Sequence, residues 1–299
     1  MNSLLHKIKW ALLPHKRMIV IIGTTASGKS GLAKRMAQQM NGELVSCDSR
    51  QIYEDISIFS GAYADMGKET VPYHLLAFKK LNESYSVQTF MRDANQKIKE
   101  IRARRNVPIV VGGTAFWAQA LMYQIDFPKV PVDEVFRETL HSETTENLFK
   151  ELNKHDYKRA ATMDPHNRKR IIRSLEIIHA LGHVPAQSKI LRKDVVIKLI
   201  YLSPDNDVMK GAIKKNIESR FRDGLIAEAD TVSQKYEEHV LQEVGLGYKH
   251  VTRFLNGEIN EEELKEKMLS EEYRYAKRQK TFCNKVFSEF KGMKEKIIQ

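Results

Sequence analysis

A glycine-bearing loop between an apolar segment and a helical one is the feature that most constrains this chain. The apolar segment, Met18–Ile22, is short and rich in β-branched residues, which is typical of a buried strand. Gly31–Met40 has the apolar spacing of a helix. The loop between them matches the phosphate-binding pattern G-x-x-x-x-G-K-[ST], and its residues are Gly23, Thr24, Thr25, Ala26, Ser27, Gly28, Lys29 and Ser30. This strand–loop–helix context predicts a P-loop.

The residue types in this loop suit a bound phosphate. Glycines let backbone N–H groups converge on phosphate oxygens, and the positive end of the following helix adds to the attraction. Lys29 would neutralise phosphate charge, and the Ser30 hydroxyl would ligate magnesium. The sequence therefore predicts a diphosphate- or nucleotide-binding site, such as an ATP site, with Mg²⁺ as cofactor.

Further apolar runs alternate with helical segments. Glu43–Cys47, Val107–Val111 and Val196–Leu202 are typical of strands, whereas Ser86–Arg105 has the spacing of a long amphipathic helix. Strands that alternate with helices predict an α/β fold, with a parallel sheet covered by helices on both faces.

The pattern changes in the middle of the chain. From Pro128 to about Pro185 only short, charged helical segments are found. We therefore predict a P-loop NTPase-like core made of 18–123 and 194–299, which ends in helices. It is interrupted by an inserted helical domain at 124–193 and preceded by an N-terminal extension, 1–17.

Composition narrows the class of partner and compartment. The net charge of +11 favours a polyanion, and two cysteines are too few for a disulfide framework or a zinc site. No apolar run reaches the roughly 18 residues of a membrane span, and Lys9 interrupts the only N-terminal apolar patch. We expect a cytoplasmic, monomeric protein that binds no membrane and has a nucleic acid as partner.

An aspartate after the second strand suggests what the phosphate site is for. Nucleotide hydrolases usually carry a carboxylate at the end of an apolar strand as a magnesium partner. The third strand of this chain instead runs into Gly112-Gly113-Thr114, and Asp48 follows the second strand, beside Ser49-Arg-Gln51. This arrangement favours a bound phosphate that is a leaving group and an aspartate that serves the acceptor.

Several further motifs occur in the order of one family. They are Asp48–Tyr53, Val71–His74, Gly112–Thr114, Asn167–Glu176, Arg220 with Gly224–Glu228, Gly245–Lys249 and Ala276–Gln279. Together with the P-loop, these motifs make the chain resemble the bacterial tRNA dimethylallyltransferases, also called tRNA isopentenyltransferases. The resemblance extends from about Met18 to Phe287.

The resemblance implies a reaction and a set of site residues. The family transfers the dimethylallyl group of dimethylallyl diphosphate to the exocyclic amine of the adenosine just 3′ of the anticodon. By resemblance, the catalytic residues are Asp48 as general base, Thr114, and Arg220, which would grip the diphosphate opposite the P-loop. Contacts to tRNA are implied for Asp48, Ser49, Arg50, Gln51, Thr114, Arg137, Lys169, Arg170, Ile171, Ile172 and Arg173, and the partner is the anticodon stem-loop.

The sequence departs from the family in a few places, and other readings remain open. Gly61-Ala-Tyr-Ala-Asp65 replaces the usual Gly-Thr-Ala-Lys-Pro, which removes a lysine. The sole role of Thr114 could be to cap a helix, and His74 could be a core histidine. The alternative functions are an adenylate isopentenyltransferase acting on free AMP, ADP or ATP, a P-loop small-molecule kinase, and an RNA-binding protein without activity.

Overall fold

Five parallel strands form the central sheet of the computed structural model, which describes residues 14–66, 71–186, 189–245 and 247–296. The strand order is β3-β2-β4-β1-β7. The strands are β1 (Arg17–Gly23), β2 (Gly42–Ser46), β3 (Tyr73–His74), β4 (Val107–Gly112) and β7 (Val196–Leu202). The predicted α/β class with a parallel sheet is confirmed, and the short edge strand β3 was not predicted.

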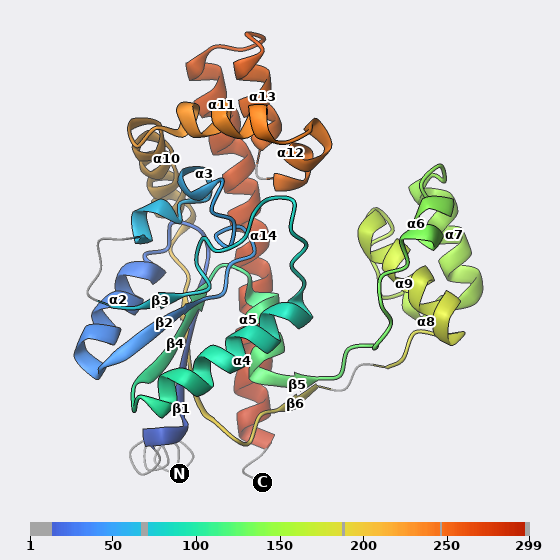
Figure 1. The fold of residues 1–299 in the computed structure, drawn as a ribbon. Helices are drawn as coiled ribbons and strands as arrows, with labels where there is room; N and C mark the ends of the chain where they lie inside the picture. Colours follow the sequence, from blue (N-terminus) through green and yellow to red (C-terminus); the bar gives the residue numbers. More distant parts are fainter. Residues whose placement is uncertain (1–13, 67–70, 187–188, 246, 297–299) are drawn as a thin grey trace. The chain divides into compact units, whose positions relative to one another are not determined.

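Both faces of the sheet are covered, which explains the continuous apolar runs in its strands. On one face, Ile19, Ile21 and Ile109 pack with Ala33 and Ala37 of α2 (Lys29–Met40). The other helices in contact with β1 or β4 are α4 (Val87–Ala103), α5 (Ala115–Met122) and α14 (Glu261–Lys296). Figure 1 shows α2 to the left of the sheet and α5 with the long α14 to its right, and α5 contacts both α4 and α14.

The predicted amphipathic helix is confirmed as α4. Phe90, Ala94, Ile98 and Ile101 are buried, as their spacing predicts. The helix begins after Ser86, whose hydroxyl accepts a hydrogen bond from the Thr89 N–H at 3.1 Å.

A second cluster of helices follows β7. It contains α10 (Asn206–Arg222), α11 (Leu225–Lys235), α12 (Glu238–Val244) and α13 (Tyr248–Leu255). These helices share a core with α3 (Ser57–Ser60) and with the first half of α14. The prediction that helices fill the end of the chain is confirmed.

The chain divides into two compact units, and the larger one comprises 1–123 and 191–299. The smaller unit, 124–190, has its own core and contains α6 (Glu134–Thr139), α7 (Thr145–His155), α8 (Tyr157–Ala160) and α9 (Arg168–Leu181). The chain leaves the larger unit through β5 (Tyr123–Ile125) and returns through β6 (Lys189–Leu191), and these strands pair with each other.

The N-terminal extension predicted at 1–17 lies outside the described residues up to residue 13. Short 3₁₀ turns occur at η1 (Pro14–Lys16) and η2 (Tyr63–Asp65). Within the described ranges, no helix combines the length and the apolar character that crossing a membrane requires.

Candidate active site

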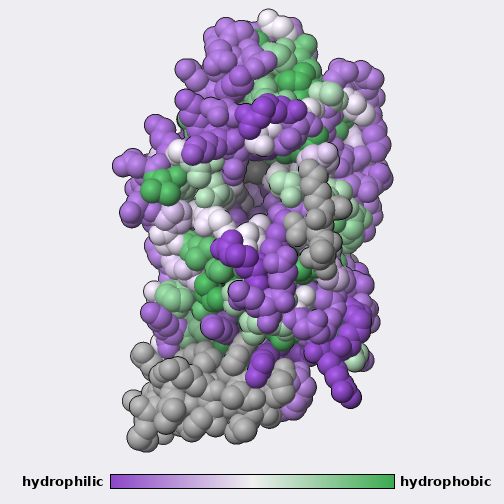
Figure 2. Space-filling view, turned by 90° about the vertical axis from the view of Figure 1, so that its left-hand side faces the viewer, coloured by the Kyte–Doolittle hydropathy of each residue, from purple (hydrophilic) through white to green (hydrophobic). Residues whose placement is uncertain are grey.

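A cavity of about 390 Å³ lies in the larger unit, beside the carboxyl ends of β1 and β2. Its walls are the P-loop, the loop after β2, α3 with the turn that follows, α10 and α14. Parallel sheets bind ligands at this edge, because strand-to-helix loops meet there. Figure 2 views the larger unit from the left of Figure 1 and shows a hollow with hydrophilic residues around it.

The P-loop has the backbone that its sequence predicts. Gly28 has φ 78°, and a Cβ there would meet nothing within 4 Å, so the backbone angle rather than space favours glycine. Ala26 also has a positive φ, 58°. The hydroxyls of Thr24 and Ser27 are buried and have no hydrogen-bond partner within the described part of the chain. Of these two residues, only Ser27 lines the cavity.

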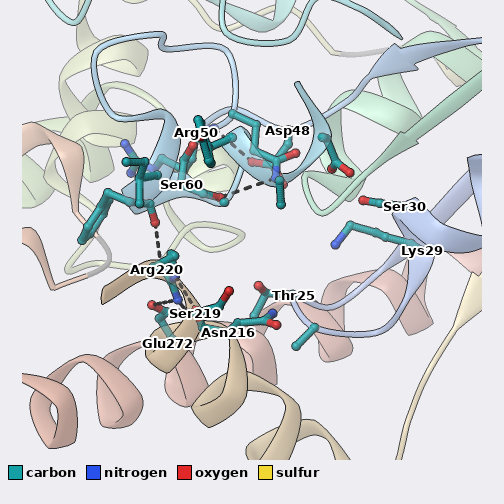
Figure 3. Close-up of a pocket in the computed structure, with 18 of the residues that line it drawn as sticks. Thr25, Lys29, Ser30, Asp48, Arg50, Ser60, Asn216, Ser219, Arg220 and Glu272 are labelled. Carbon is teal, nitrogen blue, oxygen red and sulfur yellow. Dashed lines mark hydrogen bonds and ion pairs between the residues drawn. The ribbon is translucent and has the colours of Figure 1, made fainter. Parts of the chain in front are cut away.

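Lys29 lies next to this cradle. Its ammonium donates a hydrogen bond to the Thr24 carbonyl at 3.0 Å. Burial lowers the pKa of Lys29, and the nearby Asp48 carboxylate opposes that shift. In Figure 3, Lys29 and Ser30 lie together on one side of the cavity.

Asp48 is held by the backbone of two loops. One carboxylate oxygen accepts from the Arg50 N–H at 3.0 Å, and the other accepts from the Gly113 N–H at 3.2 Å. The two neighbouring glycines are needed for this close approach. A Cβ at Gly112 would overlap the Cys47 carbonyl, and one at Gly113 would crowd Asp48. The structure thus brings the predicted base into the same cavity as the P-loop.

Thr114 holds the segment that follows Asp48. Its hydroxyl accepts from the Ser49 N–H at 2.9 Å and donates to the Ser49 hydroxyl at 3.2 Å. Thr114 is also the residue before α5, but its side chain makes no capping hydrogen bond. The reading of Thr114 as only a helix cap is therefore wrong.

Arg220 lies across the cavity from Lys29 and Ser30, on α10 (Figure 3). Its Nη2 donates to both carboxylate oxygens of Glu272 at 2.7 and 2.8 Å, and its Nη1 donates to the Phe59 carbonyl at 2.6 Å. Arg220 is only 9% exposed, so it is not a surface arginine. The guanidinium is fixed in place before any ligand arrives.

Glu228 explains the motif Gly224–Glu228. Its carboxylate accepts from the backbone N–H groups of Ile58 and Phe59 at 2.7 and 2.8 Å, which caps the start of α3. Phe59 in turn provides the carbonyl that binds Arg220. The motif therefore holds α3 and the turn after it against the cavity.

Charges of both signs line the cavity. The basic residues are Lys29, Arg50 and Arg220, and the acidic ones are Asp48, Asp65, Asp223 and Glu272. The described lining therefore has no excess of positive charge with which to neutralise a diphosphate. A divalent cation would supply that excess, and the Ser30 hydroxyl is an oxygen donor of the kind that Mg²⁺ prefers. The residues present fit a magnesium ion held mainly by phosphate and water.

Comparison with known proteins agrees with this geometry. The sequence profile of the IPP transferase family matches residues 51–286. The tRNA dimethylallyltransferase of Geobacillus kaustophilus is 33% identical over 276 residues, which cover 89% of this chain and 87% of that protein. The tRNA dimethylallyltransferase of Bacillus subtilis is 31% identical over 279 residues, which cover 90% of this chain and 88% of that protein. The chain belongs to the IPP transferase family.

Solved structures of the family share the fold. A full-length tRNA isopentenylpyrophosphate transferase from Bacillus halodurans aligns with a TM-score of 0.63 at 31% identity, over 89% of this chain and 86% of that one. A eukaryotic dimethylallyltransferase acting on tRNA aligns with a TM-score of 0.75 at 26% identity, over 88% of this chain and 69% of that one. The fold is thus the P-loop NTPase-like fold of this family, as predicted.

One family motif is altered inside the cavity. Asp65 stands at the end of the segment that departs from the family pattern, and it forms an ion pair with Lys34 of α2 at 2.8 Å. Ala64, beside it, occupies the position of the missing lysine and lines the cavity. Residues 67–70, which follow, lie outside the described chain.

His74 lies outside the cavity. His74 bonds to the buried Glu43 at 2.6 Å, which Arg104 and Asn106 also contact, and none of these lines the cavity. The reading of His74 as a structural residue is therefore the one that the structure favours.

Within the smaller unit, only part of the predicted tRNA surface is available. Lys169 and Arg170 are exposed. The Ile171 side chain is fully buried and the partly buried Ile172 packs on the same core, so the tRNA contact of these two residues stays a prediction. Arg173 donates to the carbonyls of Val130 and Pro131 and pairs with the buried Glu176, to which Arg137 also binds. These two arginines hold the unit together.

The sequence analysis gave no site role to several cavity residues, although it named Gln279 as the end of a family motif. Glu272, Tyr275 and Gln279 of α14 line the cavity, and so do Asn216 and Ser219 of α10. Glu272, Tyr275 and Gln279 recur at helical spacing in a charged segment, and this spacing was the signal that could have found them.

Proposed function

We propose that this protein transfers the dimethylallyl group from dimethylallyl diphosphate to the exocyclic N6 amine of the adenosine that is 3′-adjacent to the anticodon in tRNA. One observation carries the proposal: Asp48 faces the cavity that an intact P-loop lines, and the loop after β4 offers Gly112-Gly-Thr114 where a hydrolase would place a carboxylate. A phosphate-binding loop and a base for the acceptor therefore share one cavity.

The reaction breaks the bond between the allylic carbon and the diphosphate oxygen and forms a carbon–nitrogen bond. Negative charge grows on the departing diphosphate, and groups that are already oriented stabilise it best. In this chain they are the P-loop N–H groups, the Lys29 ammonium and the Arg220 guanidinium. The Ser30 hydroxyl would ligate a Mg²⁺ ion, which when bound neutralises phosphate charge.

The adenine amine is a weak nucleophile, because its lone pair is delocalised into the ring. Asp48 would accept the amine proton as the new bond forms, which contributes on the order of 10²–10⁴-fold. The hydrogen bonds from the Arg50 and Gly113 N–H groups fix the direction of the carboxylate. Thr114 keeps Ser49 next to it.

The family of this chain and its net charge both support tRNA as the acceptor. The relatives named above are tRNA-modifying enzymes, and the net charge of +11 suits a polyanion. We assign the anticodon stem-loop contacts of the smaller unit to Lys169 and Arg170, which are exposed. A base in a loop can be unstacked into a cavity at moderate cost. A cytoplasmic location and a monomeric state complete the proposal.

The test supplies labelled dimethylallyl diphosphate with tRNA or AMP, and labelled ATP in a separate reaction. We expect label on the adenosine next to the anticodon, and transfer that is slower by about 10²–10⁴-fold in the Asp48→Asn variant. Label on AMP would replace the proposal with an adenylate isopentenyltransferase, and phosphate transfer from ATP would replace it with a kinase.

A further inference from the structure

Gln279 joins two parts of the cavity that are far apart in the sequence. It lies on α14 and is 7% exposed. Its side-chain oxygen accepts from the Thr25 N–H of the P-loop at 2.8 Å, and its nitrogen donates to the Gly113 carbonyl at 3.2 Å. The orientation of the amide is settled by these partners, because a backbone N–H can only donate and a carbonyl can only accept.

The contact with Gly113 has a steric requirement of its own. A Cβ at Gly113 would overlap the Gln279 side-chain nitrogen. The same glycine donates its N–H to Asp48. Gly113, which follows β4, therefore accepts a hydrogen bond from Gln279 on its carbonyl and donates one to Asp48 from its N–H.

We propose that Gln279 is a positioning residue, which sets the location of Asp48 relative to the diphosphate-binding loop. It touches neither reacting group and acts through Gly113 on one side and Thr25 on the other. The inference rests on the proposed function, since Asp48 and the P-loop hold the acceptor and the donor there. A misplacement of about 1 Å between reacting groups can cost on the order of 10²-fold in rate.

The position of Gln279 on α14 adds to this reading. Glu272 lies two helical turns earlier and holds Arg220. Seven residues of helix rise by about 10 Å. One face of a single helix therefore fixes Arg220 at one end of the cavity and the P-loop with Gly113 at the other.

The experiment compares Gln279→Ala with Gln119→Ala as a matched control. Gln119 is also buried, and it also ties α14 to the core, through a bond of 2.8 Å to Glu289, but it does not line the cavity. If Gln279 only held α14 in place, the two variants would behave alike. Both proteins are studied as the full chain.

The first readout is kinetic. We expect Gln279→Ala to lower kcat by about 10²-fold, with the KM for tRNA and the Kd for pyrophosphate changed by less than about 3-fold. Gln119→Ala should keep kcat near that of the unmodified chain. A loss confined to pyrophosphate affinity, or an equal loss of kcat in both variants, would overturn the inference.

The second readout needs no activity, so that it separates this inference from the proposed function. Amide hydrogen exchange should become faster in both the P-loop and the Gly112–Thr114 segment of Gln279→Ala, and in neither segment of Gln119→Ala. Unchanged exchange at Gly112–Thr114 refutes the coupling even if tRNA is prenylated. Conversely, if the unmodified chain prenylates no tRNA, the proposed function fails, whereas altered exchange still shows that Gln279 sets the geometry of both segments.

Discussion

Replacing Glu272 with alanine is expected to destabilise the larger unit by about 3 kcal/mol, because it leaves the buried Arg220 guanidinium without its counter-ion. The side chains of Glu272 and Arg220 are 8% and 11% exposed, and both oxygens of Glu272 accept from Arg220. Breaking such a pair costs roughly 3–5 kcal/mol, and the cavity gives water some access to Arg220, which favours the lower end.

The measurement is urea unfolding followed by tryptophan fluorescence. Trp117 is buried in the larger unit, so its fluorescence reports that unit. With a slope of roughly 1–3 kcal/mol per molar urea, the midpoint should fall by about 1 M or more.

Two comparisons make the reasoning refutable. Glu271→Ala removes the neighbouring acidic residue, whose partners Lys249, His250 and Arg274 include exposed ones, and should cost less than about 1 kcal/mol. An Arg220→Met, Glu272→Leu double variant should regain most of the stability, because an apolar pair leaves no buried charge. If Glu272→Ala is as stable as Glu271→Ala, or if the double variant is as unstable as the single one, the buried pair does not have this role.

Three further outcomes are expected. Hydrogen bonds from Arg104 lower the pKa of Glu43 from 4.5 to about 2. The Glu43 carboxylate should therefore stabilise the fold by about 3 kcal/mol above pH 4.5. This contribution should be lost as the pH falls from 4.5 to 2. Glu43→Gln should therefore flatten an acid-unfolding curve over that range; an unaltered curve refutes this. Asp48→Asn should lower single-turnover rates by about 10²–10⁴-fold with pyrophosphate affinity retained, and a smaller effect would remove Asp48 as the base. Replacing Lys169 and Arg170 with glutamine should reduce the salt slope of tRNA binding by about 2, with the urea midpoint unchanged; an unchanged slope excludes them from the interface.

Much of the fold could be predicted because its signals are local. Met18–Ile22 and Val107–Val111 are apolar at every position, which only strands buried on both faces require. The apolar spacing in α4 and its cap at Ser86 likewise depend only on neighbours in the chain. β3 was missed because Tyr73–His74 is too short to show a pattern, and its pairing with β2 decides its conformation.

The site divides in the same way. The loop Gly23–Ser30 carries its own backbone requirements, so the sequence alone predicted a phosphate site. Asp48 was found because it follows a recognisable strand. Only the tertiary structure decided that Glu272 neutralises Arg220 and that Gln279 spans the P-loop and Gly113, since these partners are separated by 52, 254 and 166 residues. It also decided that Ile171 is core and that Arg173 binds Glu176. Side-chain partners across such separations depend on how helices and loops pack in space, and periodicity along the chain carries no record of that packing.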